Sequence, residues 1–311
     1  MSYNSLAVSL FRKCSASCSI CCFESTPDKT ERLEIEPLKK YILSSKQLSY
    51  IKEISFTGGE PFLEYSLLKD LVSFSKNIGK TCTCVTNAFW ADNLNDTEEC
   101  IMELKNSGLV KLTVSYDEFH SEFVKPQNII NVMKACKKIG LFLSLSIIKS
   151  SKTHQIIDEL DNDILDVPLS IHSPFYVGGA KKNNISSIQT RENKQLKCPY
   201  NGSFTLVYDG NIWPCCSPSF VETAIELGNY HCGDVSESLR TIRKHGILHI
   251  IKRFGFDFFN QEAKNLGFDV PEYVASPCEL CALYFNKNNI HLFHEAVGRK
   301  VKEIVNTVNI A

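Results

Sequence analysis

The sequence predicts an α/β fold: a partial (β/α)6 TIM-like barrel followed by a smaller C-terminal module. Short apolar runs rich in β-branched residues alternate with helical patterns, which is typical of parallel sheets built from βα units. These runs begin near Leu6, Ile51, Thr81, Val110, Leu141 and Leu169. Six βα units are too few to close an eight-stranded barrel, so we expect a curved, open sheet that binds ligands at the carboxyl ends of its strands.

Helices between these runs are indicated by apolar residues that recur on one face. The pattern is clearest at positions 35, 38, 41 and 42, at 67, 68, 71 and 72, and at 129, 132, 133 and 136. Gly79, Gly108 and Gly140 stand where three of the helices should end.

The pattern changes near residue 185, so we expect one domain over residues 1–184 and a second over residues 185–311. The second domain begins with a hairpin from Phe204 to Trp213, in which Asp209-Gly210 predicts a type I′ turn. Helices are expected over about residues 235–266 and 290–305.

Composition restricts the function classes. The chain has 311 residues, 43% of them hydrophobic, and a formal net charge of −1. Without a Lys/Arg-rich run it lacks the charge pattern of a nucleic-acid-binding protein. It shows neither a signal peptide nor an apolar run long enough to span a membrane, so we expect a cytoplasmic protein. In that reducing compartment its 14 cysteines are expected to be metal ligands, catalytic thiols or small core residues rather than disulfides.

Three of these cysteines form a tight motif directly after the first apolar run. Cys14, Cys18 and Cys21 have CxxxCxxC spacing, and thiolates are the ligands that iron–sulfur clusters select. Three protein ligands leave one iron of a [4Fe–4S] cluster open to a small chelating molecule. The alternative is a zinc site, but zinc prefers CxxC pairs and four closed ligands, and no CxxC pair lies nearby.

This spacing resembles the radical S-adenosylmethionine (radical SAM) superfamily, and a second motif strengthens the resemblance. The run from Phe56 to Pro61 follows the second predicted strand; its Gly58-Gly59 pair lets backbone approach a ligand, and Glu60 offers a carboxylate at the strand end. The resemblance implies a [4Fe–4S] cluster on the three cysteines and S-adenosylmethionine, with its amino group held by the Gly-Gly-Glu motif.

Later strands end in weaker candidates for cofactor contact. The resemblance places polar groups near the methionine carboxylate and the ribose, and the candidates are Asn87, Ser115, Asp117, Ser144 and Ser146. Ser144 and Ser146 share one face of the fifth strand. Val177-Gly178-Gly179, after the sixth strand, would let backbone reach the adenine. For each of these the alternative is an ordinary polar residue of a loop or strand.

The C-terminal part carries a second set of thiols: Cys198, Cys215, Cys278 and Cys281. Two separate segments and a CxxC pair can close four thiolates around one metal centre. The spacing of Cys198 and the run from Gly210 to Cys215 resembles the auxiliary-cluster module of SPASM and twitch radical SAM proteins. This implies one auxiliary [4Fe–4S] cluster, with a structural zinc ion as the alternative.

Cys216 differs from the other cysteines. It follows Cys215, and adjacent side chains of an extended segment point to opposite faces, so one of the two thiols is expected to stay free. Held between Pro214 and Pro218, such a thiol can give a hydrogen atom to a carbon radical; the alternative is an inert buried cysteine. Four other cysteines fall on apolar faces and are expected in the core: Cys82, Cys84, Cys100 and Cys136. Cys22, beside the third cysteine of the first motif, is also expected to be a packing residue.

The whole arrangement resembles the YydG (EpeE) peptide epimerases over nearly the full chain, as seen in residues 14–23, 114–120 and 213–218. This resemblance implies a ribosomally synthesised precursor peptide, whose L-residues become D-residues by Cα hydrogen abstraction and hydrogen return, and a reductant such as a flavodoxin or ferredoxin. The chain departs from the family at Ser203, where the epimerases carry an acidic residue. The alternatives are a peptide-crosslinking radical SAM maturase and a non-catalytic cysteine-rich scaffold that binds metal or peptide.

Overall fold

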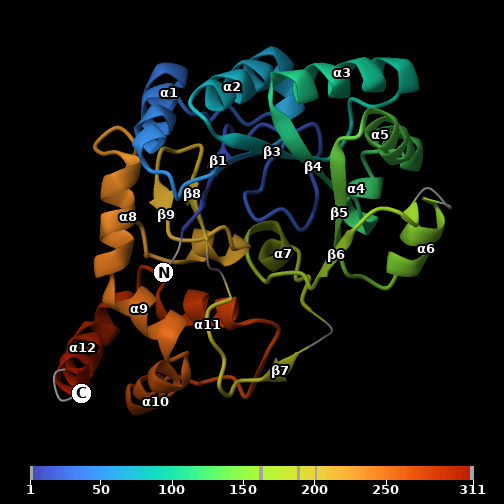
Figure 1. The fold of residues 1–311 in the computed structure, drawn as a ribbon. Helices are drawn as coiled ribbons and strands as arrows, with labels where there is room; N and C mark the ends of the chain where they lie inside the picture. Colours follow the sequence, from blue (N-terminus) through green and yellow to red (C-terminus); the bar gives the residue numbers. More distant parts are fainter. Residues whose placement is uncertain (1–2, 161–163, 188–189, 200–201, 309–311) are drawn as a thin grey trace.

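An eight-stranded, mostly parallel sheet forms the centre of the fold (Figure 1). The structure is a computed structural model that describes residues 3–160, 164–187, 190–199 and 202–308. The strands of this sheet are β1 (Ser5–Ser9), β2 (Glu53–Thr57), β3 (Thr81–Thr86), β4 (Leu109–Ser115), β5 (Phe142–Ile148), β6 (Leu169–His172), β8 (Ser203–Leu206) and β9 (Ile212–Trp213). They lie in the order β6-β5-β4-β3-β2-β1-β8-β9, and every pair is parallel except β8 and β9. The sheet therefore has two edges and forms the open partial barrel that the sequence predicts.

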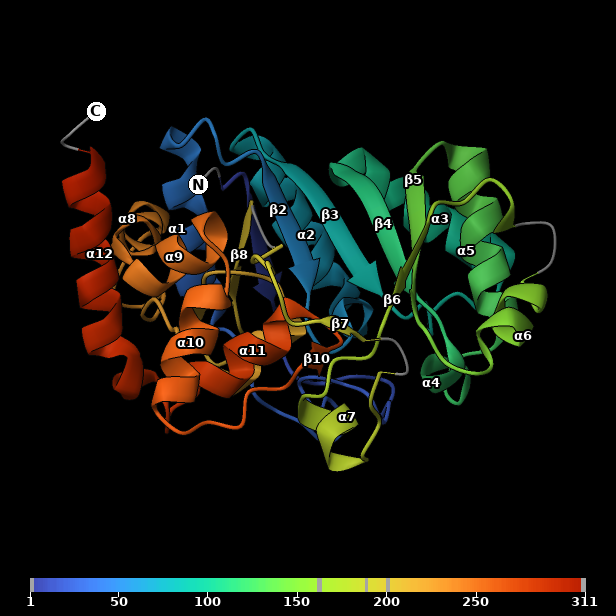
Figure 2. The same ribbon diagram turned by 90° about the horizontal axis from the view of Figure 1, so that it is seen from below.

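Helices cover the outer face of this sheet, as Figures 1 and 2 show. They are α1 (Ile35–Ser44), α2 (Tyr65–Asn77), α3 (Leu94–Ser107), α5 (Pro126–Ile139) and α6 (Thr153–Asp158), with the short turns η1 (Ser45–Gln47) and η2 (Pro61–Glu64). Gly108 ends α3, and Gly140, with φ of +72°, ends α5 in the left-handed conformation. Two short helices, α4 (Glu118–Ser121) and α7 (Gly178–Lys182), follow β4 and β6.

The C-terminal part consists mainly of helices that pack beside the end of the sheet formed by β1, β8 and β9. They are α8 (Val235–Lys244), α9 (Gly246–Arg253), α10 (Asp257–Asn265), α11 (Pro277–Tyr284) and α12 (His294–Val308), with η4 (Pro218–Glu222) and η5 (Ile290–Phe293). A small antiparallel pair, β7 (Arg191–Glu192) and β10 (Tyr273–Val274), was not predicted. One apolar cluster extends from Leu6 in the barrel to Phe259 and Phe293 in these helices. The division of the chain at residues 184 and 185 stays a prediction.

The hairpin of β8 and β9 adds to the barrel sheet because β8 pairs in parallel with β1. Its turn differs from the predicted type I′ turn, in which both central residues have positive φ. Here Gly210 has φ of +85°, whereas Asp209 is not in the positive region. The amide of Gly210 donates to the Val207 carbonyl (2.8 Å), and the amide of Val207 donates to the Asn211 carbonyl (2.9 Å). The connection is thus a three-residue loop that needs glycine at one position only.

Four cysteines have the core positions expected of them. Cys82, Cys84 and Cys136 are buried in the main apolar cluster, and Cys100 packs against it. No helix in the described part of the chain combines the length and apolar character that crossing a membrane requires.

The Gly58-Gly59 pair after β2 is required by the packing of the chain on itself. A Cβ atom on Gly59 would lie 1.7 Å from the Lys13 carbonyl oxygen, and one on Gly58 would lie 2.7 Å from the Phe11 carbonyl oxygen. Hydrogen bonds close this contact, because the Gly59 amide donates to Phe11 (2.6 Å) and the Glu60 amide donates to Lys13 (3.0 Å). The close approach that the sequence suggests for a ligand is made here by the backbone that leads into the first cysteine motif.

Replacing Gly59 with Ala is therefore expected to lower the free energy of unfolding by about 3 kcal/mol or more, because backbone rather than a flexible side chain fills the space. Gly298 provides the matched control, since it lies in α12 and a Cβ there meets nothing within 4 Å. Gly298→Ala should raise the free energy of unfolding by roughly 0.5–1 kcal/mol through helix propensity. Chemical denaturation measures both changes, and equal effects of the two substitutions would contradict this account of Gly59.

Candidate functional site

A cavity of about 420 Å³ lies at the carboxyl ends of the barrel strands. Its wall contains all three cysteines of the first motif and most of the predicted cofactor residues. These are Cys14, Cys18, Cys21, Gly58, Gly59, Glu60, Asn87, Ser115 and Ser146, together with Cys216 from the C-terminal part. The open sheet thus brings together motifs from both ends of the sequence.

The loop that carries the first motif is also held on its other side, by the glycines after β6. A Cβ atom on Gly178 would lie 2.3 Å from the Cys22 carbonyl oxygen, and the Gly179 amide donates to the Cys21 carbonyl (2.9 Å). Asn183 Nδ2 donates to the Ser19 carbonyl (2.9 Å). This glycine pair, which the sequence suggests for adenine contact, is used to pack the cysteine loop.

The thiols of this loop are suited to bind a metal centre, because without one they would stay protonated. Burial raises the pKa of Cys14 to about 12 and raises the pKa of Cys18 far above its ordinary value. Thiolates at these positions therefore need the positive charge of a metal to stay ionised. Three sulfurs in one loop match the donor set of an iron–sulfur cluster with one open iron. Cys22, expected to be a packing residue, also lines the cavity.

Glu60 is a fully buried carboxyl group at the cavity wall. Its Oε1 atom accepts hydrogen bonds from the Thr86 hydroxyl (2.7 Å) and the Phe62 amide (3.1 Å), and its Oε2 atom accepts one from the Asn87 amide (2.7 Å). These donors favour the ionised form, but burial outweighs them and raises the pKa of Glu60 to about 7. A carboxylate in this position is suited to pair with a cationic group of a ligand.

Asn87 connects the end of β3 to the cysteine loop. Its Nδ2 atom donates to the Ser15 hydroxyl (3.0 Å) and lies 3.8 Å from the Cys14 sulfur, while its Oδ1 atom accepts from the Phe89 amide (3.0 Å). The side chain therefore positions the loop as well as lining the cavity.

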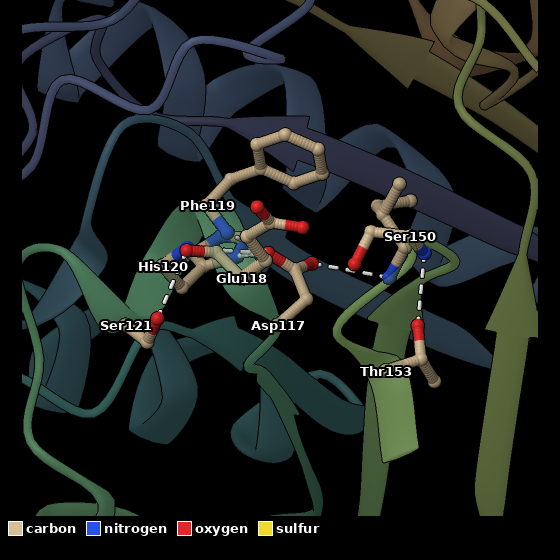
Figure 3. A network of polar contacts seen from close by, with 8 residues as sticks. Asp117, Glu118, Phe119, His120, Ser121, Ser150 and Thr153 are labelled. Atoms are coloured by element: carbon tan, nitrogen blue, oxygen red, sulfur yellow. Dashed lines mark hydrogen bonds and ion pairs between the residues drawn. The ribbon is translucent and has the colours of Figure 1, made fainter. Parts of the chain in front are cut away.

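Two predicted cofactor residues, Asp117 and Ser144, do not line the cavity. Figure 3 shows the Asp117 side chain within its network of polar contacts. Asp117 Oδ1 accepts from the amides of Phe119 and His120, and Asp117 Oδ2 accepts from the Ile148 amide (3.1 Å). The carboxylate thus caps α4 and ties it to the end of β5. The Ser144 hydroxyl lies 3.0 Å from the Thr113 hydroxyl within the sheet. Both side chains serve the framework around the site rather than its surface.

His120 is a cavity residue that the sequence analysis did not select. Its Nδ1 atom lies 2.8 Å from Asp117 Oδ1. Because a carboxylate only accepts hydrogen bonds, Nδ1 is the donor and Nε2 is left for other contacts. The signal in the sequence is the Asp-x-x-His spacing at the start of a short helix, where an N-cap carboxylate can also reach the imidazole.

The four thiols of the second set line a separate, enclosed pocket. Cys198 precedes β8, Cys215 follows β9, and Cys278 and Cys281 lie one turn apart on α11. The pocket also contains Lys252, whose ammonium contacts the Tyr3 hydroxyl and lies 4.5 Å from the centroid of the Tyr3 ring. A partly buried cation beside four thiols offsets the negative charge of a thiolate-bound metal centre, so the donor set fits an iron–sulfur cluster.

In neither set of cysteines do the sulfur atoms converge on a single point. Within the described ranges, no three His, Cys, Asp or Glu side chains are arranged closely enough to hold one metal ion. The sulfurs lie instead around the two cavity walls.

Cys215 and Cys216 face different spaces, although they are neighbours in the chain. Cys215 belongs to the wall of the four-thiol pocket, and Cys216 belongs to the wall of the larger cavity. The Cys215 carbonyl accepts a hydrogen bond from the Thr205 hydroxyl (2.9 Å), which fixes this segment against β8.

Comparisons with known proteins agree with this architecture. Residues 8–158 match the family model described as the Radical SAM superfamily. The chain is 32% identical to "Putative peptide biosynthesis protein YydG" of Bacillus subtilis strain 168, over 97% of this chain and 98% of that protein. It is also 26% identical to GTP 3′,8-cyclase of Helicobacter pylori strain 26695, over 85% of this chain and 95% of that protein.

Solved structures show the same fold at low sequence identity. Native anSMEcpe with bound AdoMet and the Cp18Cys peptide has a TM-score of 0.57 and 13% identity, over 98% of this chain and 99% of that chain. BtrN in complex with AdoMet and 2-DOIA has a TM-score of 0.52 and 17% identity, over 80% and 87% of the two chains. The family match and the near full-length similarity to YydG, together with the partial barrel and its three-cysteine loop, show that the chain belongs to the radical SAM superfamily.

Proposed function

We propose that this radical SAM enzyme converts L-residues of a ribosomally synthesised peptide into D-residues. The observation that carries the proposal is the place of Cys216, whose thiol lines the same cavity as Cys14, Cys18 and Cys21. Inversion at a carbon needs a hydrogen donor in addition to hydrogen abstraction, and a thiol outside both proposed ligand sets supplies one. The name of the YydG relative and the peptide bound to anSMEcpe support a peptide substrate.

Different residues of the cavity would bind the cluster and S-adenosylmethionine. Cys14, Cys18 and Cys21 would bind a [4Fe–4S] cluster, and the Glu60 carboxylate would pair with the amino group of S-adenosylmethionine. Gly58, Gly59, Asn87, Ser115 and Ser146 would form the rest of the cofactor site. When bound, the reduced cluster and S-adenosylmethionine supply a 5′-deoxyadenosyl radical, which removes a hydrogen atom from a carbon such as Cα.

Cys216 then provides the returning hydrogen atom. Cys216 is an exposed residue, but the protein around its thiol removes part of the water, which raises the pKa and keeps the sulfur in the protonated form that hydrogen-atom transfer requires. The S–H bond breaks and a Cα–H bond forms, which leaves a thiyl radical on Cys216. One electron and one proton restore the thiol, and we propose a flavodoxin or ferredoxin as the source of the electron. We place the enzyme in the cytoplasm, where such reductants and unmodified precursor peptides are found.

Cys198, Cys215, Cys278 and Cys281 are proposed to bind an auxiliary [4Fe–4S] cluster, with zinc as the alternative. Replacing all four with Ala should reduce iron after anaerobic reconstitution from about eight to about four atoms per chain and leave zinc unchanged. Replacing Cys14, Cys18 and Cys21 with Ala should remove the other four iron atoms and abolish formation of 5′-deoxyadenosine. Metal analysis and product chromatography measure these changes. If the variant without the four C-terminal cysteines loses zinc instead of iron, the second centre is a zinc site. If the variant without Cys14, Cys18 and Cys21 still cleaves S-adenosylmethionine, these cysteines do not hold the cluster.

The affinity for S-adenosylmethionine should depend on the ionisation of Glu60. The pKa of Glu60 in the free protein is about 7, and only the carboxylate pairs with the ammonium group of the cofactor. Binding should therefore be roughly eightfold weaker at pH 6 than at pH 7.5, as follows from the fraction of ionised carboxyl. Glu60→Gln should bind less tightly at both pH values and lose this dependence. Equilibrium dialysis under anaerobic conditions tests this, and an unchanged pH dependence in Glu60→Gln would assign it to another group.

The proposal as a whole is tested at Cys216. Cys216→Ala should keep both clusters and still form 5′-deoxyadenosine, but it should produce little or no D-residue. Because a thiol exchanges its proton with solvent, the wild-type reaction in D₂O should place one deuterium at each inverted Cα. Chiral amino-acid analysis and mass spectrometry measure both results.

Two matched variants make the Cys216 test specific. Cys22 also lines the cavity, so Cys22→Ala tests the competing donor, and Cys232 is an exposed thiol that lines neither space. Both variants should epimerise normally. Normal epimerisation by Cys216→Ala, or a product without deuterium, would refute the assigned donor. A product lighter by two hydrogens would identify the enzyme as a crosslinking maturase, and a protein that forms no 5′-deoxyadenosine would be a binding scaffold.

A further inference from the structure

A second, larger hollow of about 1,040 Å³ lies beside the cavity, on the side of the C-terminal part. We call it the outer groove. Its wall is formed by residues after β6, by the end of η4, by β10 and by the C-terminal end of α11 and the loop that follows. The residues of its wall include Tyr176, Val177, Lys181, Glu222, Tyr273 and Lys287.

The outer groove and the cavity share a wall. Val177 lines both spaces. Immediately before it, Phe175 lines the cavity while Tyr176 lines the groove. The same division occurs in η4, where Pro218 lines the cavity and Glu222 lines the groove. The groove and the cavity that contains Cys216 are therefore adjacent, on either side of the segment from Phe175 to Val177.

The size of the cavity explains why a second space is needed. Pockets of about 300–1,000 Å³ enclose one small-molecule ligand. The cavity's 420 Å³ lies at the lower end of this range, so with S-adenosylmethionine bound it cannot also enclose a long peptide. The residues on one side of the reacting residue must then leave the cavity along a neighbouring surface.

The chemistry of the outer groove suits an uncharged, extended peptide. Its charged residues are two lysines, Lys181 and Lys287, and two glutamates, Glu222 and Glu279. Lys181 and Glu222 pair at 3.1 Å, and Glu279 accepts a hydrogen bond from the Ala275 amide (3.0 Å). No strong field of one sign is left to select a charged ligand.

Two aromatic side chains are available for contact in this groove. Tyr176 is 41% exposed and Tyr273 is 57% exposed, although both lie in a concave wall. Tyrosine offers a large rigid contact area and a hydroxyl group, and it is a common anchor in sites that bind peptide chains.

We propose that the outer groove binds the segment of the precursor peptide that flanks the reacting residue, with Tyr176 and Tyr273 as its anchors. This inference rests on the proposed function, since it takes a peptide as the substrate. The groove sets which part of a long peptide is presented to the cavity, and a short peptide that reaches only the cavity does not use it.

The experiment compares two fluorescein-labelled peptides based on the precursor read from the open reading frames beside this gene. One is the full precursor, and the other is a short peptide centred on the reacting residue. Tyr273→Ala and Tyr176→Ala should each raise Kd for the full precursor about tenfold and leave Kd for the short peptide unchanged. Fluorescence anisotropy with S-adenosylmethionine but no reductant measures binding without turnover.

Two further variants control the comparison. Tyr273→Phe keeps the ring and should retain most of the affinity for the full precursor. Tyr50 is 38% exposed, lies outside both spaces and packs on Arg243, so Tyr50→Ala should bind both peptides as the wild type does. Wild-type affinity of the Tyr176→Ala/Tyr273→Ala double variant for the full precursor would overturn the proposal. An equal loss for both peptides would also overturn it, because it would show a general change in the cavity.

The result is separable from the proposed function. If the wild type forms no D-residue and yet the tyrosine variants lose affinity only for the full precursor, the peptide-binding role of the groove is supported and epimerisation is refuted. If the wild type epimerises and the variants bind and react normally, epimerisation stands and the groove is refuted.

Discussion

The site depends on how one segment is packed: the backbone of the first cysteine loop lies between two glycine pairs. Gly58 and Gly59 hold it where it leaves β1, and Gly178 and Gly179 hold it beyond the third cysteine. A Cβ atom at any of these positions would overlap the loop's carbonyl groups. The loop contains no helix or strand and is closed by isolated backbone hydrogen bonds, such as that from the Cys21 amide to the Cys18 carbonyl, so the barrel surfaces contribute much of what fixes its conformation. The same glycines that mark the family in sequence are therefore required by the packing of the cysteine loop, whatever else Gly58 and Gly59 contact in the cavity.

The framework of the site could be predicted where a local sequence pattern determines the position of an element or a strand end. Alternating strands and helices gave the open parallel sheet, and strand ends gave Glu60, Asn87 and Ser146 positions on one rim. Local patterns were insufficient where the partner is distant in sequence. Asp117 was a reasonable candidate for ligand contact, but its second oxygen is taken by the Ile148 amide, a bond set by the pairing of β4 and β5. His120 was missed for the same reason, because its place in the cavity depends on that carboxylate.

The turn between β8 and β9 shows a different limit. Asp-Gly is a strong signal for a tight hairpin, but loop length is decided by the register of both strands, and here the register of Thr205 with Trp213 leaves room for three residues. The outer groove had no sequence signal at all, because its wall combines residues from four separate segments. Such surfaces become visible only when the fold has placed those segments together.

The hairpin also determines which space each of the two neighbouring cysteines faces. Thr205 fixes the segment after β9, and Cys215 and Cys216 then fall on alternate sides of an extended chain. Both are cysteines in the same short run, so they differ only in which side of the extended chain each side chain occupies. An insertion or deletion of a single residue between Gly210 and Cys215 would exchange the environments of odd and even positions, whereas a change of two residues would preserve them. Which cysteine faces the cavity is therefore set partly by the length of the segment between Gly210 and Cys215 and not only by the identity of its residues.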